Sequence, residues 1–225
     1  RLFAEGRNQP SITERAEKRW VALMSALGNP KGSEAIFGDL LKRYGESHRA
    51  YHILAHIVSM LDELEAVKDM LTDWKAVAMA TWYHDVVYDT TAVHDCYAVA
   101  RNEERSAHRA AQDLEKLGLP AQVIVRVKDL IRATAHAIPV VDADAQFLVD
   151  LDLAILGRSE EEFDAYEDGI RTEYGWIPRQ DFRVARAKIL KSFLDRPSIY
   201  STQLFRDKYE RAARRNLKRS IKQLQ

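Results

Sequence analysis

Histidine and aspartate residues recur at three places in this 225-residue chain, in an order suited to binding a metal ion. In chain order, these residues are His52, His56, His84, Asp85, Asp150 and Asp152. A buried imidazole or carboxylate is costly unless it is paired or binds a metal ion. Because the residues lie in or beside apolar segments, a metal ion shared between them would offset that cost.

The adjacent pair His84 and Asp85 ends an otherwise apolar helix and is the centre of the pattern. Upstream, His52 and His56 are four residues apart, which on an α-helix places them on one face, one turn apart. Downstream, Asp150 and Asp152 interrupt the apolar segment 148–157. A lone His-Asp pair is a weak signal, but the three groups together favour a metal site over a purely structural role.

The spacing of apolar residues and the capping signals predict helices throughout and no alternating strand pattern. The predicted helices cover residues 12–27, 33–44, 47–70, 73–84, 101–118, 120–136, 148–157, 159–174, 181–195 and 198–225. We predict a single all-α helical bundle over residues 1–225, with a metal-binding core at about 47–157 and C-terminal helices 159–225 packed on it. The segment 89–99, with His94 and Asp95, is expected to be a loop beside the site.

Composition narrows the classes of partner. Lys plus Arg equals Asp plus Glu at 34 each, so no net charge attracts the whole protein to nucleic acid or to an anionic membrane. Apolar stretches are broken by charges well before the ~20 residues of a membrane span. The single cysteine, Cys96, fits a reducing compartment, and we expect a cytoplasmic protein.

Several sequence blocks resemble a bacterial branch of the HD superfamily of metal-dependent phosphohydrolases, and they extend from about Arg49 to Leu217. The blocks are Tyr-His-x-x-x-His, Trp-Tyr-His-Asp-Val-Val-Tyr-Asp, Asn-Glu-Glu-x-Ser-Ala, Asp-x-Asp-Leu-Ala-Ile-Leu-Gly, Ile-Arg-x-Glu-Tyr, Ile-Tyr-Ser-Thr and Glu-x-x-Ala-Arg-x-Asn-Leu. The chain departs from that branch at Ala185, where a glycine is expected before Arg186. The resemblance implies an all-α fold of the HD or phosphodiesterase type, but it does not imply a substrate.

By this resemblance, the metal ligands fall on His56, His84, Asp85 and Asp152. His52 competes with His56 for the first position, and His56 is preferred because the second histidine of the related phosphodiesterase pattern binds metal. Asp150 competes with Asp152 for the last position and would otherwise orient a neighbouring ligand. Two imidazoles and two carboxylates suit one or two divalent ions of Mn, Fe, Zn, Co or Mg.

The same resemblance gives catalytic roles to His52 and Asp85, and Arg49 is a third catalytic candidate because a planar guanidinium close to His52 suits a phosphate. Metal-activated water is expected to attack phosphorus, since a bound ion lowers the pKa of water from about 15.7 to about 7. His52 would protonate the leaving oxygen, unless it is simply a core histidine, and Arg49 would contact the phosphate. Further candidates for ligands, supporting groups or substrate contacts are Glu103, Glu104, His136, Lys128 and Arg132.

The sequence therefore predicts a metal-dependent phosphohydrolase acting on a nucleotide or another small phosphate ester. A nucleotide-sensing or partner-binding module with a structural metal is the alternative, and a di-iron oxygenase is a third. Nucleic acid and membranes are not favoured as partners, because the basic residues of the last helix are typical of a solvated face. The aromatic residues Tyr200, Phe205 and Tyr209 belong either to the core or to a homodimer contact.

Overall fold

Helices form the regular secondary structure of the residues that this computed structural model describes, 10–91, 99–136 and 139–225. These ranges contain no strand, so the predicted all-α class is confirmed. The helices are α1 (Ile12–Ala26), α2 (Ser33–Tyr44), α3 (Leu54–Val67), α4 (Trp74–Tyr83), α5 (Val99–Lys116), α6 (Ala121–Ala133), α7 (Ala143–Leu153), α8 (Glu160–Glu173), α9 (Arg179–Leu194), α10 (Gln203–Phe205) and α11 (Arg211–Leu224). Most of the predicted loop 89–99, including His94 and Asp95, lies outside the described residues.

Short turns of other helix types complete the chain. A 3-10 turn follows α3 at Lys68–Met70, and another follows α7 at Ala154–Gly157. A π-helical turn, Arg206–Glu210, connects α10 to α11.

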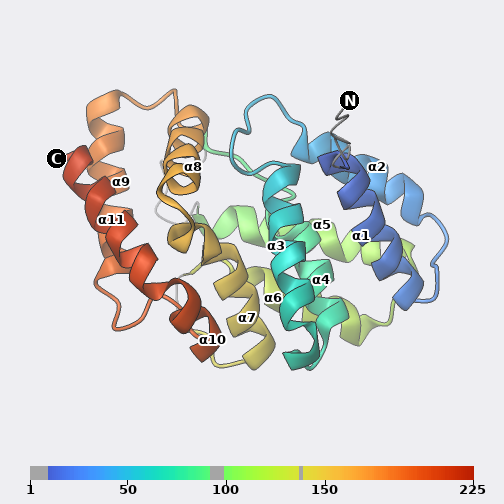
Figure 1. Cartoon of the computed structure of the whole chain (residues 1–225). Helices are drawn as coiled ribbons and strands as arrows, with labels where there is room; N and C mark the ends of the chain where they lie inside the picture. The colour runs from blue at the N-terminus through green and yellow to red at the C-terminus, as the bar shows by residue number, and fades with distance from the viewer. Residues whose placement is uncertain (1–9, 92–98, 137–138) are drawn as a thin grey trace, which may run out of the picture.

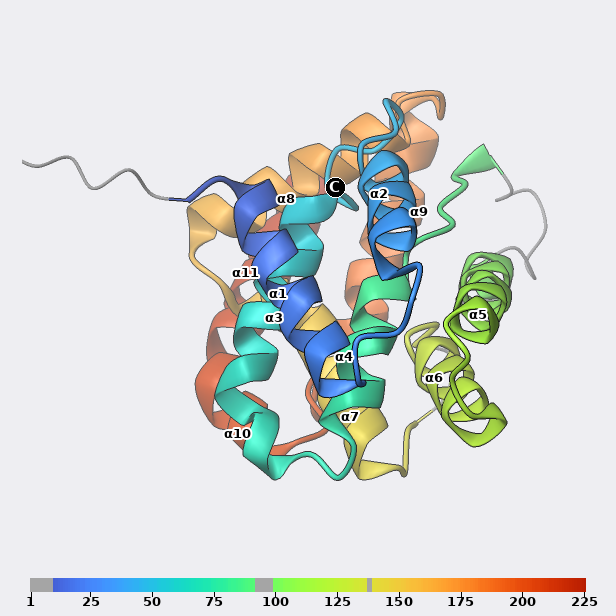
Figure 2. The same ribbon diagram turned by 90° about the vertical axis from the view of Figure 1, so that its right-hand side faces the viewer.

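The helices form one bundle in which α1 and α2 lie at one end and α8, α9 and α11 at the other (Figure 1). Between these ends, α3, α4 and α7 pack on one another. A second view shows α5 and α6 lying side by side against the flank of α4 (Figure 2). The three central helices are the ones that carry His56, His84 and Asp152.

Helix α4 is mainly apolar, and its residues from Ala76 to Tyr83 are all buried, as expected of a helix in the centre of a bundle. Asp73 caps its N-terminus by accepting a hydrogen bond from the backbone N–H of Ala76 at 3.0 Å. Near its other end, Trp82 packs edge-on against Trp20, with ring centroids 5.4 Å apart. The Tyr44 hydroxyl donates to the Trp82 carbonyl oxygen at 2.7 Å. These contacts fix the end of α4, where His84 is the C-terminal capping residue.

The predicted helix 47–70 is wrong in its first part, because α3 begins only at Leu54. The backbone N–H groups of Ala50, Tyr51 and His52 all donate to one carboxylate oxygen of Glu173, at 2.8, 2.8 and 2.9 Å. Since these N–H groups already donate to Glu173, they do not require the backbone carbonyl oxygens that would accept their hydrogen bonds in a helix. His52 lies in this turn and His56 in the first turn of α3, so the two are not on one helical face.

Asp150 does not support the predicted metal site. One of its carboxylate oxygens accepts from the backbone N–H of Ser201, and the other accepts from the N–H and the hydroxyl of Thr202, each at 2.7 Å. Asp150 is fully buried and its two oxygens are committed to this turn. Its function is to attach the segment before α10 to α7.

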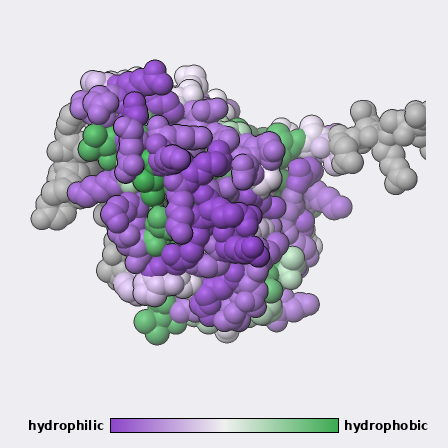
Figure 3. All heavy atoms as spheres, turned by 60° about the vertical axis from the view of Figure 1, so that its left-hand side comes forward, coloured by the Kyte–Doolittle hydropathy of each residue, from purple (hydrophilic) through white to green (hydrophobic). Residues whose placement is uncertain are grey.

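The C-terminal helices pack on the rest of the bundle through buried aromatic residues. Tyr200, Phe205 and Tyr209 are all buried, which places them in the core and removes them as candidates for a dimer contact. Gly157 leaves room for this packing, because a Cβ atom there would lie 2.5 Å from the Cβ of Tyr209. The outer face on this side is mainly hydrophilic, with small hydrophobic patches (Figure 3).

Within the described ranges, none of the helices is both long enough and apolar enough to cross a lipid bilayer.

We expect Asp150→Ala to lower the free energy of unfolding by about 3 kcal/mol, because three hydrogen bonds to a buried carboxylate are lost. Urea denaturation measures the change. Asp207→Ala, at an exposed position of the same segment, should change the free energy by no more than about 0.5 kcal/mol. Folded Asp150→Ala should bind as much metal as the native chain, and a loss of metal would instead support the role predicted from the sequence.

Candidate metal centre

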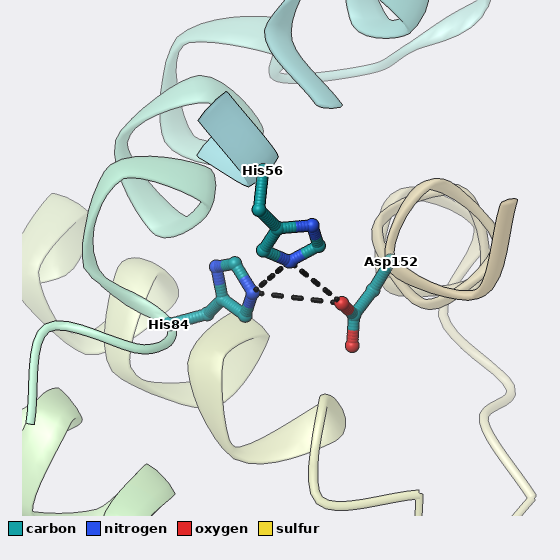
Figure 4. Close-up of side chains that lie close together, drawn as sticks. All are labelled: His56, His84 and Asp152. Atoms are coloured by element: carbon teal, nitrogen blue, oxygen red, sulfur yellow. Dashed lines mark hydrogen bonds and ion pairs between the residues drawn. The ribbon is translucent and has the colours of Figure 1, made fainter. Parts of the chain in front are cut away.

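Three side chains from three helices converge on one point (Figure 4). His56 comes from the first turn of α3, His84 from the end of α4 and Asp152 from the last turn of α7. The Nε2 atoms of His56 and His84 lie 3.3 Å apart. Oδ1 of Asp152 lies 3.2 Å from His56 Nε2 and 3.6 Å from His84 Nε2. These three residues form a group that could hold a metal ion.

The spacing of the three atoms fits ligands of one ion. Ligands bound at about 2.1 Å are separated by about 3.0 Å at right angles and by about 3.4 Å in a tetrahedron. The observed separations, 3.2 to 3.6 Å, lie close to this range. Without a proton or cation between them, lone pairs of three buried groups would face one another at an energetic cost.

Second contacts orient both imidazole rings. Nδ1 of His84 lies 2.9 Å from the carbonyl oxygen of Thr81, which can only accept, so Nδ1 carries a proton. In the neutral ring, the lone pair is then on Nε2, which faces the cluster. Nδ1 of His56 pairs with the Tyr51 hydroxyl at 3.0 Å. When Nδ1 donates in this pair, the lone pair of the neutral ring is on Nε2, which also faces the cluster.

Asp85 lies at the edge of this three-residue group. Its Oδ2 atom is 2.9 Å from Nε2 of His84 and 3.8 Å from Nε2 of His56. The carboxylate can therefore reach an ion held by the two histidines. Asp85 remains a candidate fourth ligand, less tightly placed than Asp152.

The charges of the carboxylates dominate the electrostatics of the site. Burial lowers the pKa of His84, but the charges of Asp85 and Asp152 outweigh burial and raise it well above its ordinary value. Burial and the neighbouring His84 instead lower the pKa of His56. Although burial opposes ionisation, the pKa of Asp152 stays well below its ordinary range because three histidines surround it. Positive charge between these groups is therefore stabilised by the ionised carboxylates, and either a metal ion or a proton can provide it.

His52 is held by Glu173, which the sequence analysis did not single out. Nδ1 of His52 donates to a Glu173 carboxylate oxygen at 2.7 Å, and its Nε2 lies 4.0 Å from Oδ2 of Asp85. Burial alone lowers the pKa of His52, but the charge of Asp85 and the bond to Glu173 raise it above its ordinary value. His52 therefore lies beside the metal ligands without belonging to their group.

Arg49 does not contact the site cavity, which contradicts its predicted role as a phosphate ligand. Its guanidinium donates to the carbonyl oxygens of His52, Asp85 and Val86 at 3.0, 2.8 and 3.1 Å. A further bond joins it to Glu46, and its side chain is 0% exposed. Arg49 instead ties the turn that carries His52 to the turn that carries Asp85.

The remaining candidates separate into two groups. Nε2 of His136 lies 2.9 Å from Oδ2 of Asp152, and Glu103 lines the same cavity. His136 has a φ of +53°, which is rare for a residue other than glycine and directs its ring inward. Burial, with the charge of Asp85, raises the pKa of Glu103 to about 7. Both residues therefore lie beside the group of His56, His84 and Asp152, and their roles stay predictions.

Glu104, Arg132 and Lys128 are not part of the site. Arg132 binds Glu104 through two hydrogen bonds of 2.7 and 2.9 Å on the surface between α5 and α6. Lys128 does not line the cavity, and its charge acts on Glu104. These three residues lie apart from the described lining of the cavity, and their contact with substrate or metal stays a prediction.

The site opens into a cavity of about 320 Å³. His52, Asp85, Glu103, His136 and Asp152 line one part of it. Tyr88, α8, α9 and the residues after α7 line the remainder. A small molecule that enters this cavity reaches Asp152 and Asp85 directly.

Glu173 and Tyr51 are the supporting residues that sequence reasoning missed. Both lie within strings that resemble the HD superfamily, Ile-Arg-x-Glu-Tyr and Tyr-His-x-x-x-His, but nothing in their spacing shows which residue they contact. Comparisons with known protein families, with curated proteins and with solved structures found no match.

We expect the native chain, purified without chelator, to contain about one equivalent or more of a divalent metal, and His84→Ala to lose it. Mass spectrometry of the purified proteins measures the content. His108→Ala, at an exposed position of α5, is the matched control and should retain the metal. If the native chain stayed metal-free after Mn, Fe and Zn had been supplied, the candidate metal site would be rejected.

Glu173 should stabilise the fold in a pH-dependent way. Burial raises its pKa, but the bonds and charge of His52 and the backbone N–H groups lower it from 4.5 to about 2. Because the pKa of Glu173 is lower in the folded state, its ionisation stabilises the fold at any pH above the pKa of the unfolded chain, by about 3 kcal/mol. This contribution is lost as the pH falls from about 4.5 towards 2.

The difference in free energy of unfolding between the native chain and Glu173→Gln should therefore be larger at pH 7 than at pH 3. Urea denaturation at the two pH values measures it. A difference that did not depend on pH would show that the charge of Glu173 has no such effect.

Proposed function

We propose that this protein is a metal-dependent phosphohydrolase that acts on a small phosphate ester. The observation that carries the proposal is the convergence of His56, His84 and Asp152 on one point, with Asp152 at the wall of a cavity that His52 and Asp85 also line. The resemblance of the sequence blocks to the HD superfamily supports the same activity. The donor set of imidazole and carboxylate suits Mn, Fe, Zn, Co or Mg.

A divalent ion in this group supplies Lewis acidity, which lowers the pKa of water and offsets the charge on phosphoryl oxygens. The residues of the chain then have separate tasks. His56, His84 and Asp152 bind the ion, and Asp85 adds a fourth ligand or positions the nucleophilic water.

His52 is suited to protonate the leaving oxygen. Glu173 holds its Nδ1 proton, so the Nε2 atom is the one free to exchange a proton in the cavity. The raised pKa of His52 favours the protonated ring near neutral pH, which a general acid requires. Glu173 keeps the ring in this orientation, since the same carboxylate also binds the backbone of residues 50–52.

Glu103 is suited to accept a proton from water. Its Oε2 atom is buried without a hydrogen-bond partner among the described residues. Its pKa, raised to about 7 by burial and the nearby carboxylates, matches a group that exchanges protons at neutral pH. His52 and Glu103 thus provide an acid and a base in one cavity.

We expect His52→Asn to lower kcat for phenethyl phosphate by about 10²- to 10⁴-fold without loss of bound metal, because its alkoxide leaving group must be protonated and a general acid is removed but no ligand is. Steady-state kinetics and metal content measured on the same preparation test this. Asp85→Asn should also lower kcat, and the surface variant His108→Asn should leave it unchanged. Activity that survived both His52→Asn and Asp85→Asn would refute the proposal, and tight binding of phosphate esters without turnover would favour a sensing role.

A further inference from the structure

The cavity is chemically divided between a polar wall and an apolar wall. The ionisable groups of the metal centre form the polar wall. The apolar wall consists of aliphatic and aromatic side chains, namely Leu153, Ile155, Leu156, Ile170, Ile177, Phe182, Ala185, Ile189 and Phe193. The rings of Tyr166 and Tyr174 extend this wall.

Two helices present the apolar wall at helical spacing. On α8, Tyr166 and Ile170 are four residues apart. On α9, Phe182, Ile189 and Phe193 lie on one face, together with Ala185 and Arg186. These helices pack on the bundle with a stripe of side chains that lines the cavity. Ile189 is 48% exposed, so it lies at the open edge of the cavity.

The polar side chains within the apolar wall are already bound to other groups of the protein. The guanidinium of Arg186 bonds to the Glu167 carboxylate and to the Tyr166 hydroxyl. Asn102 uses its amide N–H and its amide oxygen on the backbone of Asp89. The Thr134 hydroxyl donates to the carbonyl oxygen of Ile131. Each of these groups thus uses part of its hydrogen-bonding capacity within the protein, which leaves less of it for a polar ligand.

Positive charge for a polyphosphate is also lacking in the described lining. Arg186 is the arginine that lines the cavity there, and Glu167 neutralises it. Arg49, the other candidate, is enclosed by backbone carbonyl oxygens. The metal ion and a protonated His52 would compensate one phosphate, but a second or third phosphate would meet carboxylates without a free arginine.

We propose that the cavity takes a phosphate monoester whose organic group is uncharged and apolar, with one aromatic ring or an aliphatic group of similar size. This inference rests on the proposed phosphohydrolase function and specifies its substrate class. The single phosphate lies at the polar wall, and the organic group packs between α8 and α9. A nucleobase would leave its hydrogen-bonding edges unpaired against this wall, which disfavours nucleotides. The volume of about 320 Å³ is at the lower end for small-molecule sites and fits such an ester.

Three esters of primary alcohols test the preference, because their leaving oxygens are of similar reactivity. The esters are phenethyl phosphate, adenosine 5′-monophosphate and glycerol 1-phosphate. We expect kcat/KM for phenethyl phosphate to exceed the other two values by at least about tenfold. Equal or higher values for the nucleotide would overturn the inference and leave the hydrolase function intact.

Two lysine substitutions on α9, one at the edge of the cavity and one away from it, form a matched pair of variants. Ile189→Lys should lower kcat/KM for phenethyl phosphate by about tenfold or more. It should also lower the ratio of this value to kcat/KM for adenosine 5′-monophosphate. Val184→Lys lies on the same helix, is 63% exposed in the native chain and does not line the cavity. It should leave the three values unchanged. Melting temperatures of both variants show whether they remain folded.

Binding of phenethyl phosphonate, a non-hydrolysable analogue, separates the two hypotheses. Calorimetry should show that metal-loaded native protein binds it, that Ile189→Lys weakens its affinity by about tenfold and that Val184→Lys does not. If this pattern of binding were found but none of the three esters were hydrolysed, the phosphohydrolase function would be rejected and the apolar binding site would be retained. No binding, or equal binding by both variants, would overturn the inference.

Discussion

The buried negative charge of Asp85 and Asp152 is the constraint on which the centre of this structure depends. Two carboxylates that approach the same pair of imidazoles are stable only when positive charge or hydrogen-bond donors compensate them. His56, His84 and His136 surround Asp152, and His84 lies closest to Asp85. Three helices and the turn at residues 134–136 are thereby held around one point. The same requirement makes this point a natural site for a divalent ion.

The turn before α3 is equally determined by charge. Glu173 binds three consecutive backbone N–H groups and the His52 ring, and Arg49 binds carbonyl oxygens from both the His52 turn and the Asp85 turn. The Glu173 carboxylate and the Arg49 guanidinium thus bind backbone groups that would otherwise form the hydrogen bonds of a helix. This arrangement lets His52 face Asp85, although its backbone lies outside α3. It also explains why an arginine near the site is unavailable to a phosphate.

The division of the cavity follows from the way the C-terminal helices pack. α8 and α9 each have an apolar stripe, and both stripes line the cavity opposite the metal ligands. Asp150 helps to hold this arrangement, since it attaches the segment before α10 to the helix that carries Asp152. The chemistry and the proposed selectivity therefore depend on different parts of the chain. The central helices provide the polar wall, and the later helices provide the apolar wall.

Local signals in the sequence determined the helices and most of the polar cluster. Capping signals and apolar periodicity predict the starts of α1, α2 and α8 to within a residue or two. They do not predict the starts of α3 and α7, which lie at Leu54 and Ala143 instead of at 47 and 148. Polar residues in apolar segments marked the pairs His52 and His56, His84 and Asp85, and Asp150 and Asp152. The resemblance to a known family, and not the local pattern, favoured His56 and Asp152 within these pairs. Such signals are contained in a few neighbouring residues, so they need no knowledge of the fold.

Only the tertiary structure shows which charged side chains lie at the candidate metal centre and which bind other parts of the protein. Arg49, Asp150 and Arg132 each have plausible types and positions in the sequence, but their partners lie 36, 51 and 28 residues away. Glu173 reaches His52 across 121 residues, and no local pattern predicts that contact. Long-range packing determines the partner of each buried charge. The role of such a residue can therefore be read only once the helices have been placed.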